Sequence, residues 1–515
     1  MGILRTYFDK DTTLIRDSYV NTGRNPIVEL FHGGSLKAEE VKYSRYIFDL
    51  NFNEILKRVN SKDIPYVSGM THTLKMTNTS CFDQEQLCKT VSSCVGDIKR
   101  ATCFELILFE VPESWCEGNG YDYTQTIVSC AEGDKVYCEG PANWFVRGDV
   151  TTCWSNEGVY ATDPSNWCAS ATTSGTSGTT ICSGGTNLII ATQHFNFGNE
   201  NVCIDITDYI NGLILSGYTG LTYGLGLAFK PSLEQAPLED AEYVGFFSRE
   251  TNTVFEPFLE TKWNDRISDD RNKFYLNKSN NICLYVNAGG QNTNATFSGV
   301  DVYDQNDDLF TTIPSSGITQ ITRGVYCINL TVDDNPTSGY CGNIQFRDVW
   351  KDVTVGTKNL GNVELDFIVL DDTDYYRIGS TNSANANGLG VGSASNMSIY
   401  DYDFNVVGIK RKEKIKRGDT RRVNVNVRIP YTYDQTALLD KVYYRIFIKE
   451  GGHIQIDYID WQEVSRTPDG NFFLVDTSWF IPNDYFIEIK IESGGEVRTY
   501  GDIIPFEVVS EKDWC

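Results

Sequence analysis

Histidine is scarce in this chain, and the familiar catalytic motifs are missing. Only 4 of its 515 residues are His, and they are scattered. Nucleophilic catalysis needs a base positioned beside the nucleophile, yet the sequence has no Gly-x-Ser-x-Gly elbow, Walker loop or His-Glu-x-x-His. Its many carboxylates do not by themselves make a glycosidase pair, because an acidic surface is equally rich in them. The sequence therefore predicts a protein that is not an enzyme and that binds no cofactor.

Long apolar runs are missing as well. The first six residues, Met1 to Thr6, contain no apolar segment of the kind that a secretory signal needs. No stretch approaches the roughly 20 apolar residues that cross a bilayer. We therefore expect a protein with neither a secretory leader nor a membrane contact.

Paired-cysteine motifs are absent although cysteine is plentiful. Of the 15 Cys, eleven lie between Cys81 and Cys203, but none form Cys-x-x-Cys and their spacings match no zinc signature. Because we expect no export, the compartment should be reducing. The sequence thus predicts free thiols buried as small hydrophobic side chains. Disulfides that form after the protein leaves the cell are the alternative.

A calcium loop is also absent. The run Asp304 to Asp308 offers oxygens at alternating positions, but Leu309 stands where an EF-hand needs Gly and Ser315 where it needs a bidentate Glu. We interpret the acidic run Asp371–Asp374 as a solvated turn. The sequence predicts no metal site.

Positive charge is in short supply. Lys and Arg number 44 against 69 Asp and Glu, which gives a net charge of −25. Such a surface repels nucleic acid and anionic lipid. We expect no membrane partner and no sequence-specific nucleic-acid binding.

The composition favours an all-β fold of several β-sandwich domains. Hydrophobic residues make up 41% and aromatic residues 13% of the chain, Gly is frequent, and helical patterns are few. At this length a single core is not expected. We predict a jelly-roll-like β-sandwich over 1–263 with a Cys/Gly/Ser-rich insertion at about 78–187, an immunoglobulin-like sandwich over 264–398, and a second one over 399–515.

The strand pattern is clearest in the last of these domains. Val423, Val425, Val427 and Ile429 alternate with polar residues, as in a half-buried strand. The residues of 487–491 repeat the pattern. Turn residues separate such strands, as an immunoglobulin-like sandwich requires.

A basic segment stands out in the otherwise acidic chain. It either guards an exposed strand edge or forms a contact surface for acidic neighbours, including another copy of the chain. Nucleic acid is a weaker partner, because no aromatic stacking residues interleave the run. The candidate interface residues are Lys410, Arg411, Lys412, Lys414, Lys416, Arg417, Arg421 and Arg422.

The aromatic content leaves a second function open. The flat faces of aromatic side chains can stack on sugar rings, so a receptor- or glycan-binding module is the alternative to a structural protein. Most of the Tyr and Phe residues occupy alternating strand positions, however, which indicates core packing.

Two stretches resemble a family of virion structural proteins from tailed bacteriophages, including crAss-like phages. The first comprises Thr12–Ile15, Asn21–Leu30 and Ser44–Leu50, and the second comprises Val244–Thr253 and Phe255–Trp263. The first stretch is also similar to the N-terminal part of DNRLRE-type β-sandwich domains. The insertion has no counterpart in the family.

The resemblance implies a non-enzymatic component of the neck, tail ring or tail hub of a phage particle. It implies assembly in the host bacterial cytoplasm, contacts with neighbouring neck and tail proteins, and a ring of roughly twelve copies. The C-terminal half resembles the family mainly in its β-pattern, so the basic segment is a hypothesis from charge alone.

Overall fold

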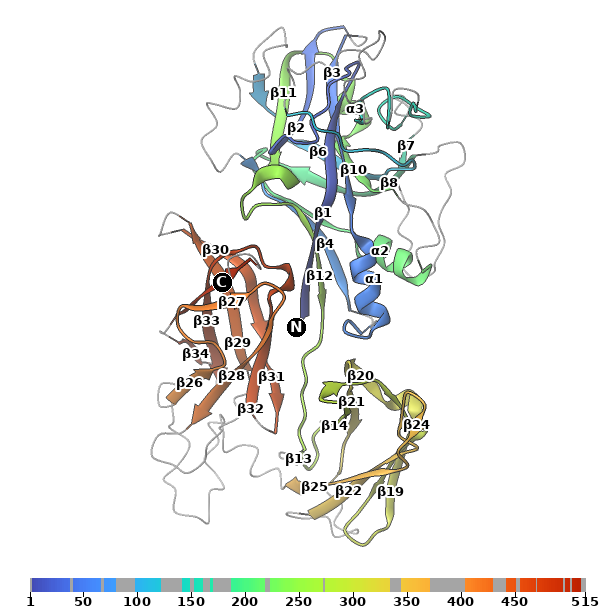
Figure 1. Ribbon diagram of the computed structural model, residues 1–515, viewed down its shortest axis with the longest axis vertical. Coiled ribbons are helices and arrows are strands. Elements are labelled where there is room, and N and C mark those ends of the chain that lie inside the picture. The colour runs from blue at the N-terminus through green and yellow to red at the C-terminus, as the bar shows by residue number, and fades with distance from the viewer. Residues whose placement is uncertain are drawn as a thin grey trace. The chain divides into compact units, whose positions relative to one another are not determined.

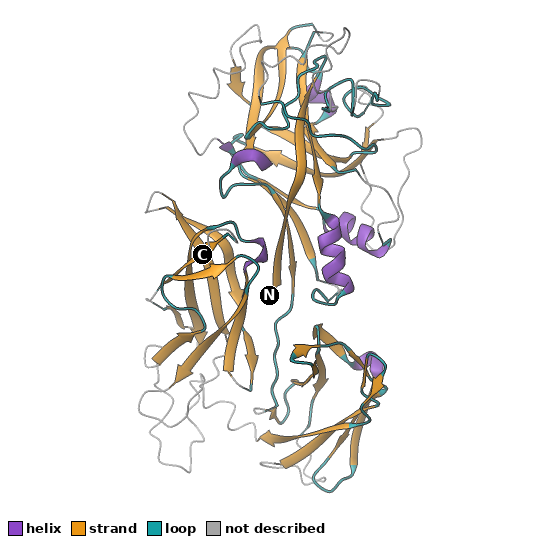
Figure 2. Cartoon of the chain, in the orientation of Figure 1, coloured by secondary structure: helices purple, strands orange, loops and turns teal. Residues whose placement is uncertain are grey.

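The computed structural model describes most of the chain. The described residues are 2–37, 40–65, 69–79, 98–121, 141–148, 152–160, 167–169, 187–217, 223–271, 274–333, 344–370, 403–428, 441–450, 454–468, 470–493, 496–500 and 503–510. Strands dominate them, as Figure 2 shows. This confirms the prediction of an all-β, multi-domain protein.

The chain divides into two compact units. We call residues 3–57 with 70–262 the N-terminal unit, and residues 1–2, 58–69 and 263–515 the C-terminal unit. The boundaries of the three predicted domains stay a prediction. No helix of the described residues is long and apolar enough to cross a membrane.

The N-terminal unit is built on one 12-stranded sheet (Figure 1). The strands along its main path run in the order β7-β8-β6-β10-β3-β1-β12-β4-β9, and β2, β11 and β5 are attached to one side of it. Its strands are β1 (Gly2–Ile15), β2 (Ile27–Ser35), β3 (Lys42–Leu50), β4 (Thr71–Met76), β5 (Ile98–Arg100), β6 (Phe104–Glu110), β7 (Trp167–Ala169), β8 (Asn187–Phe195), β9 (Val202–Asp205), β10 (Leu225–Phe229), β11 (Leu238–Phe247) and β12 (Phe258–Trp263). Its helical segments are α1 (Phe52–Asn60), α2 (Thr207–Leu215), α3 (Pro231–Glu234) and the 3-10 turn η4 (Arg249–Thr251).

Strand β3 connects the two parts of this sheet. Its residues from Arg45 onward pair with β1 on one side and with β10 on the other, whereas Tyr43 and Lys42 pair with β2. Because β3 belongs to both parts, its side chains are buried almost throughout. The sheet can therefore fold over a core that includes Tyr43, Ile47 and Trp144.

The predicted insertion contains a central strand. β6 lies between β8 and β10 and buries Leu106 and Leu108 completely. The Ser/Gly-rich run 170–180 of the insertion lies outside the described residues. Helix α1 lies before the insertion, and its buried residues Phe52, Ile55 and Val59 are spaced as on one face of a helix.

The first part of the C-terminal unit is a β-sandwich with its own core. Its strands are β13 (Phe274–Tyr275), β14 (Asn280–Tyr285), β15 (Asn287–Ala288), β16 (Gln291–Asn292), β17 (Ala295–Thr296), β18 (Gly299–Tyr303), β19 (Leu309–Pro314), β20 (Thr319–Thr322), β21 (Val325–Leu330), β22 (Ile344–Lys351), β23 (Thr354–Val355), β24 (Lys358–Asn359) and β25 (Val363–Leu370), with the 3-10 turn η5 (Ser315–Gly317). The five-stranded sheet β13-β25-β22-β18-β19 and the three-stranded sheet β14-β21-β20 enclose a core centred on Phe346 and Trp350.

The expectation of buried free thiols is only partly met by the cysteines whose state the structure describes, because two are buried but bridged and four are free but exposed. Cys283 and Cys327 occupy directly opposite positions on β14 and β21, with Cα atoms 4.1 Å apart, and form a disulfide. Both are buried. The remaining free thiols among the described residues are exposed, and they are Cys103, Cys116, Cys153 and Cys203. Register, which the sequence does not reveal, brings the bridged pair together.

The second part of the C-terminal unit is a two-sheet sandwich. One sheet has the order β26-β28-β32-β31, and the other has β27-β35-β33-β29-β30 with β34 paired to β33. The strands are β26 (Asp403–Val407), β27 (Glu413–Lys416), β28 (Thr420–Arg428), β29 (Lys441–Glu450), β30 (Ile454–Glu463), β31 (Ser465–Thr467), β32 (Gly470–Asp476), β33 (Asn483–Ser493), β34 (Glu496–Thr499) and β35 (Ile504–Val509), with the 3-10 turn η9 (Thr477–Trp479). The predicted alternations lie on β28 and β33, where Val423, Val425 and Ile487 are buried.

Candidate interaction site

The basic segment crosses from one sheet of the C-terminal sandwich to the other. Its first residues form a turn, β27 is an edge strand of the six-stranded sheet, and β28 then enters the four-stranded sheet. On β27, Ile415 is fully buried, so Lys414 and Lys416 lie on the outward side.

The side chains of the basic segment are accessible. Six of the eight cations are exposed, namely Lys410, Arg411, Lys412, Lys414, Arg417 and Arg422. The other two, Lys416 and Arg421, are half-buried. A contact surface requires such exposure, and so does a strand edge protected by charge.

The eight cations do not share one face. Lys414 Nζ lies 3.3 Å from a carboxylate oxygen of Glu507, on the outward side of the six-stranded sheet. Arg422 lies on the four-stranded sheet, where its guanidinium covers the ring of Phe472 at 3.9 Å from the centroid. The structure thus brings together the cations from Lys410 to Arg417 and separates Arg422 from them.

The same six-stranded sheet has further cations that sequence reasoning missed. Cationic and aromatic side chains alternate across its outward side, and we call them the cation–aromatic ladder. Its members in spatial order are Tyr443, Lys490, Trp461, Arg445, Phe447, Lys449 and Phe486.

Each step of the ladder places a cation over a ring. Lys490 Nζ lies 4.6 Å from the ring centroid of Tyr443 and 5.0 Å from that of Trp461. Arg445 bridges Trp461 and Phe447 at 5.0 and 5.1 Å. Such contacts are worth about 0.5–1 kcal/mol each at exposed sites. The detectable sequence signal is the alternation of accessible and buried residues from Lys441 to Ile446 of β29, which ends at the fully buried Phe447.

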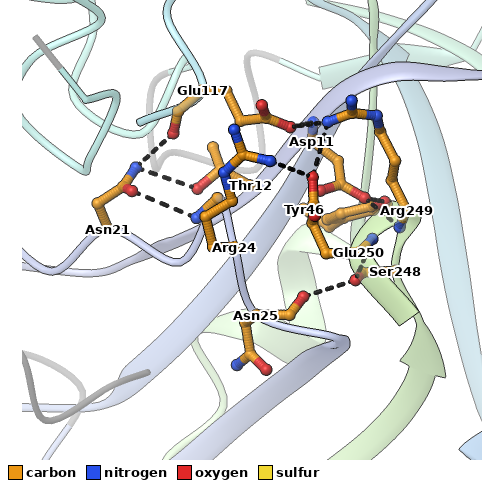
Figure 3. A network of polar contacts seen from close by, with 11 residues as sticks. Asp11, Thr12, Asn21, Arg24, Asn25, Tyr46, Glu117, Ser248, Arg249 and Glu250 are labelled. Carbon is orange, nitrogen blue, oxygen red and sulfur yellow. Dashed lines mark hydrogen bonds and ion pairs between the residues drawn. The ribbon is translucent and has the colours of Figure 1, made fainter. Parts of the chain in front are cut away.

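A second polar arrangement lies in the N-terminal unit (Figure 3). We call it the polar clasp, because it joins segments far apart in the sequence. Its members are Asp11, Thr12, Asn21, Arg24, Asn25, Tyr46, Glu117, Ser248, Arg249 and Glu250.

Asp11 is the most buried carboxyl of the clasp. Its Oδ2 accepts hydrogen bonds from the Tyr46 hydroxyl at 2.7 Å and from the backbone N–H of Arg249 at 2.8 Å. Burial raises the pKa of Asp11 to about 7, and the nearby Glu117 carboxylate adds to the shift. The pKa of the Tyr46 hydroxyl is raised as well, first by burial and then by Asp11.

Two arginines bind the acidic members of the clasp. Arg249 donates from one guanidinium nitrogen to Glu117 at 3.0 Å and to Glu250 at 2.9 Å. Arg24 donates to the same oxygen of Glu250 at 2.6 Å. Glu117 Oε1 also accepts from the backbone N–H of Asp11. Because these carboxylate oxygens are occupied by donors, the arrangement is that of a structural joint.

Asn21 holds the loop that carries Glu117. Its amide nitrogen donates to the backbone oxygens of Glu117 and Ala142 at 2.7 and 2.8 Å, and its Oδ1 accepts from the N–H of Gly120 at 2.9 Å. The backbones approach so closely that a Cβ on Gly120 would lie 1.8 Å from the carbonyl oxygen of Asn21. The loop therefore requires Gly at this position.

The clasp joins the two stretches, Thr12–Leu50 and Val244–Trp263, that the sequence analysis singled out. Asp11 lies just before the first stretch, which supplies Arg24 and Tyr46, and the second supplies Ser248 and Arg249. Arg45, also in the first stretch, makes a fully buried ion pair with Glu234 of α3, its Nη2 lying 2.9 Å from the carboxylate. These residues fix the interior of the N-terminal unit.

The possible metal ligands and the buried histidines can be placed among the residues that the structure describes. No group of three or more His, Cys, Asp or Glu in those ranges could hold a metal ion. Burial lowers the pKa of both His32 and His72 to about 4, so both are neutral at pH 7. Asp304 Oδ1 accepts from the N–H groups of Asn306 and Asp308, which makes it a turn-closing residue. Asp371–Asp374 lie outside the described residues.

One cavity of about 280 Å³ lies beside the disulfide. Asn281 and Asn329, which line it, hydrogen-bond each other at 3.0 Å, and Cys327 forms part of its wall. The lining amides are thus engaged within the protein.

Many aromatic side chains are core residues, such as Trp144, Trp350 and Tyr485, which are all essentially unexposed.

Comparisons with known proteins identify no family. No protein-family model matches the chain, and no curated protein matches it. Among solved structures, the fibronectin(III)-like modules of Clostridium thermocellum CbhA are 11% identical over 48% of this chain and 94% of their own, with a TM-score of 0.16. Three N-terminal domains of the bacteriophage RB49 outer capsid protein Hoc are 12% identical over 46% and 66%, with a TM-score of 0.15. The adhesin InvE of Yersinia pseudotuberculosis is 12% identical over 47% and 58%, with a TM-score of 0.15. At such TM-scores these likenesses carry no argument about function.

Proposed function

We propose that this chain is a non-enzymatic structural component of a tailed-phage particle. It forms part of a ring in the neck or tail through contacts with copies of itself and with neighbouring virion proteins. The observation that carries the proposal is the exposed basic segment on an otherwise acidic chain. The phage setting comes from the resemblance of the two stretches that meet in the polar clasp.

The distribution of charge along the chain supports contacts between copies. Residues 1–262 contain 33 acidic and 19 basic side chains, whereas residues 403–515 contain 19 acidic and 16 basic ones. The exposed basic segment of one copy can attract the acidic residues of another, and such head-to-tail contacts close into a ring when the rotation between subunits allows it.

Particle assembly tests the proposal. Reversing four exposed charges, Lys410→Glu, Arg411→Glu, Lys414→Glu and Arg417→Glu, should prevent incorporation into particles while the isolated chain stays folded. Quantitative mass spectrometry of purified particles measures incorporation, and circular dichroism measures folding. The control reverses four exposed lysines elsewhere, Lys42, Lys57, Lys62 and Lys358, and should be incorporated normally.

Normal incorporation of the basic-segment variant into particles would contradict the interface hypothesis. Saturable binding of the isolated protein to host cells or polysaccharide would instead support the receptor- or glycan-binding alternative.

A further inference from the structure

We infer that the basic segment is one edge of a larger docking face, and that this face binds the acidic surface of a second copy of the chain. The face, which we call the cationic corner, consists of Lys412, Lys414 and Lys449 around Phe486 and Pro505. The inference rests on the proposed function and names the partner of the same site.

A continuous row of residues connects the ladder with the basic segment. Phe447 pairs with Phe486 across β29 and β33, and their rings stack with centroids 5.5 Å apart. Phe486 in turn pairs with Pro505 across β33 and β35. The N–H of Lys412 donates to the carbonyl oxygen of Pro505 at 2.6 Å. The turn of the basic segment therefore adjoins the end of the ladder.

Three lysines from three different elements gather at this end. Lys449 of β29 places its Nζ 4.7 Å from the ring centroid of Phe486, which is half-buried. Lys414 pairs with Glu507 in the register of β27 and β35, two residues along from Pro505. Lys412 lies in the turn just before β27. From the sequence alone only Lys412 and Lys414 are recognisable as neighbours, because Lys449 lies outside the basic segment.

Ion pairing differs between the two ends of the ladder. At the far end, Arg445 binds Glu488 at 2.6 Å and Asp457 at 3.1 Å, and Lys490 Nζ lies 3.0 Å from Glu492. These cations are neutralised within the sheet.

The cationic corner is not neutralised in this way. Within the described part of the chain, no carboxylate oxygen lies within 4.0 Å of Nζ of Lys412 or Lys449. Lys414 pairs with Glu507 at 3.3 Å, but the two side chains are 61% and 39% exposed. An exposed ion pair of this kind contributes little to stability. The corner therefore keeps positive charge beside an apolar ring.

This chemistry selects an acidic protein surface as the partner. The net charge of −25 on the whole chain repels a phosphate backbone, and the corner offers an apolar ring that phosphates do not match, which disfavours nucleic acid. A protein surface offers carboxylates for the lysines and an apolar side chain for Phe486. A second copy of the chain provides acidic surface, since residues 1–262 have 14 more acidic than basic side chains.

Sedimentation velocity of the full-length protein tests the inference. Wild type should self-associate at low salt and dissociate as salt rises, because screening weakens contacts between charges. The triple variant Lys412→Glu, Lys414→Glu, Lys449→Glu should remain monomeric. Lys449→Glu alone should weaken association about tenfold. Lys441→Glu, an exposed lysine at the other end of β29, is the matched control and should associate as wild type does.

Mixing adds a second readout. The triple variant keeps its acidic surface, so it should bind the cationic corner of the terminal wild-type subunit in an assembly. Because the variant has no cationic corner of its own, no further subunit can bind to it, and the assemblies should become smaller. Wild type that stays monomeric at low salt, or equal effects of Lys449→Glu and Lys441→Glu, would overturn the inference. So would salt-sensitive binding of a single-stranded oligonucleotide in place of self-association. If particle incorporation still depends on the basic segment, the proposed function survives that failure, because the partner is then a different virion protein.

Discussion

Asp11 shows how a single residue can make the stability of the N-terminal unit depend on pH. Its carboxyl is buried, accepts two hydrogen bonds, and has its pKa raised to about 7. A raised folded-state pKa means that the folded chain binds this proton more tightly than the unfolded chain. The contribution of Asp11 to stability is therefore complete below about pH 4 and is lost as the pH rises through about 7.

The substitution Asp11→Asn should remove this pH dependence. The amide oxygen can accept the bonds from Tyr46 and Arg249 that Oδ2 accepts now, and no charge needs to be buried at high pH. The variant's free energy of unfolding minus that of wild type should be larger at pH 8 than at pH 5. The difference should exceed about 1 kcal/mol, since one pKa unit is worth about 1.4 kcal/mol. Denaturant unfolding at both pH values measures the gain. A gain equal at both pH values would contradict the prediction, and the exposed Asp63→Asn is the control.

At the scale of elements, strands with clear alternation were predictable and their partners were not. Val423 and Val425 on β28, and Ile487 and Ile489 on β33, are buried as their period indicates. Pairing depends on contacts distant in sequence. Cys283 and Cys327, 44 residues apart, therefore gave no signal of a bridge.

The candidate site was predictable only in part for the same reason. The basic segment is local in sequence, so its charge is evident from composition. Lys449 and Phe486 reach it only through the register of β29, β33 and β35. In the polar clasp, Glu117 lies within the predicted insertion, and nothing in the sequence indicates that it contacts Arg249.

The disulfide between β14 and β21 should stabilise the sandwich that contains it. A bridge across 44 residues restricts the unfolded chain and is worth about 4 kcal/mol by chain entropy. The double variant Cys283→Ala, Cys327→Ala should therefore lower the Tm of this sandwich by more than about 10 °C. Differential scanning calorimetry measures the shift. A reductant should lower the wild-type Tm similarly and leave that of the variant unchanged, whereas an unchanged wild-type Tm would contradict the prediction.

At the scale of the whole molecule, stability is divided among several cores, and a small cluster of Ile267, Cys283, Val325, Cys327 and Phe472 links the two sandwiches of the C-terminal unit. The core around Trp350 draws all its buried residues from Phe274 to Val369. That sandwich also contains its own disulfide. Its residues therefore have the core and the covalent link that independent folding requires.

A fragment of residues 264–370 should accordingly fold by itself. We expect a single cooperative thermal transition and a β-type circular dichroism spectrum from the oxidised fragment. Gradual, non-cooperative unfolding would show that the fragment needs the rest of the chain. A fragment of residues 403–510, expressed in parallel, tests whether the last sandwich also folds by itself.

The close packing in the polar clasp defines a pattern by which relatives can be found. A Cβ at Gly23 would lie 2.4 Å from the carbonyl oxygen of Glu117, and one at Gly120 would lie 1.8 Å from that of Asn21. Descendants of a common ancestor can exchange surface residues freely but not these two glycines. A search profile built on Asn21, Gly23, Gly120 and Arg249, with variable spacing between them, should detect distant relatives whose overall sequence identity is too low for an ordinary search.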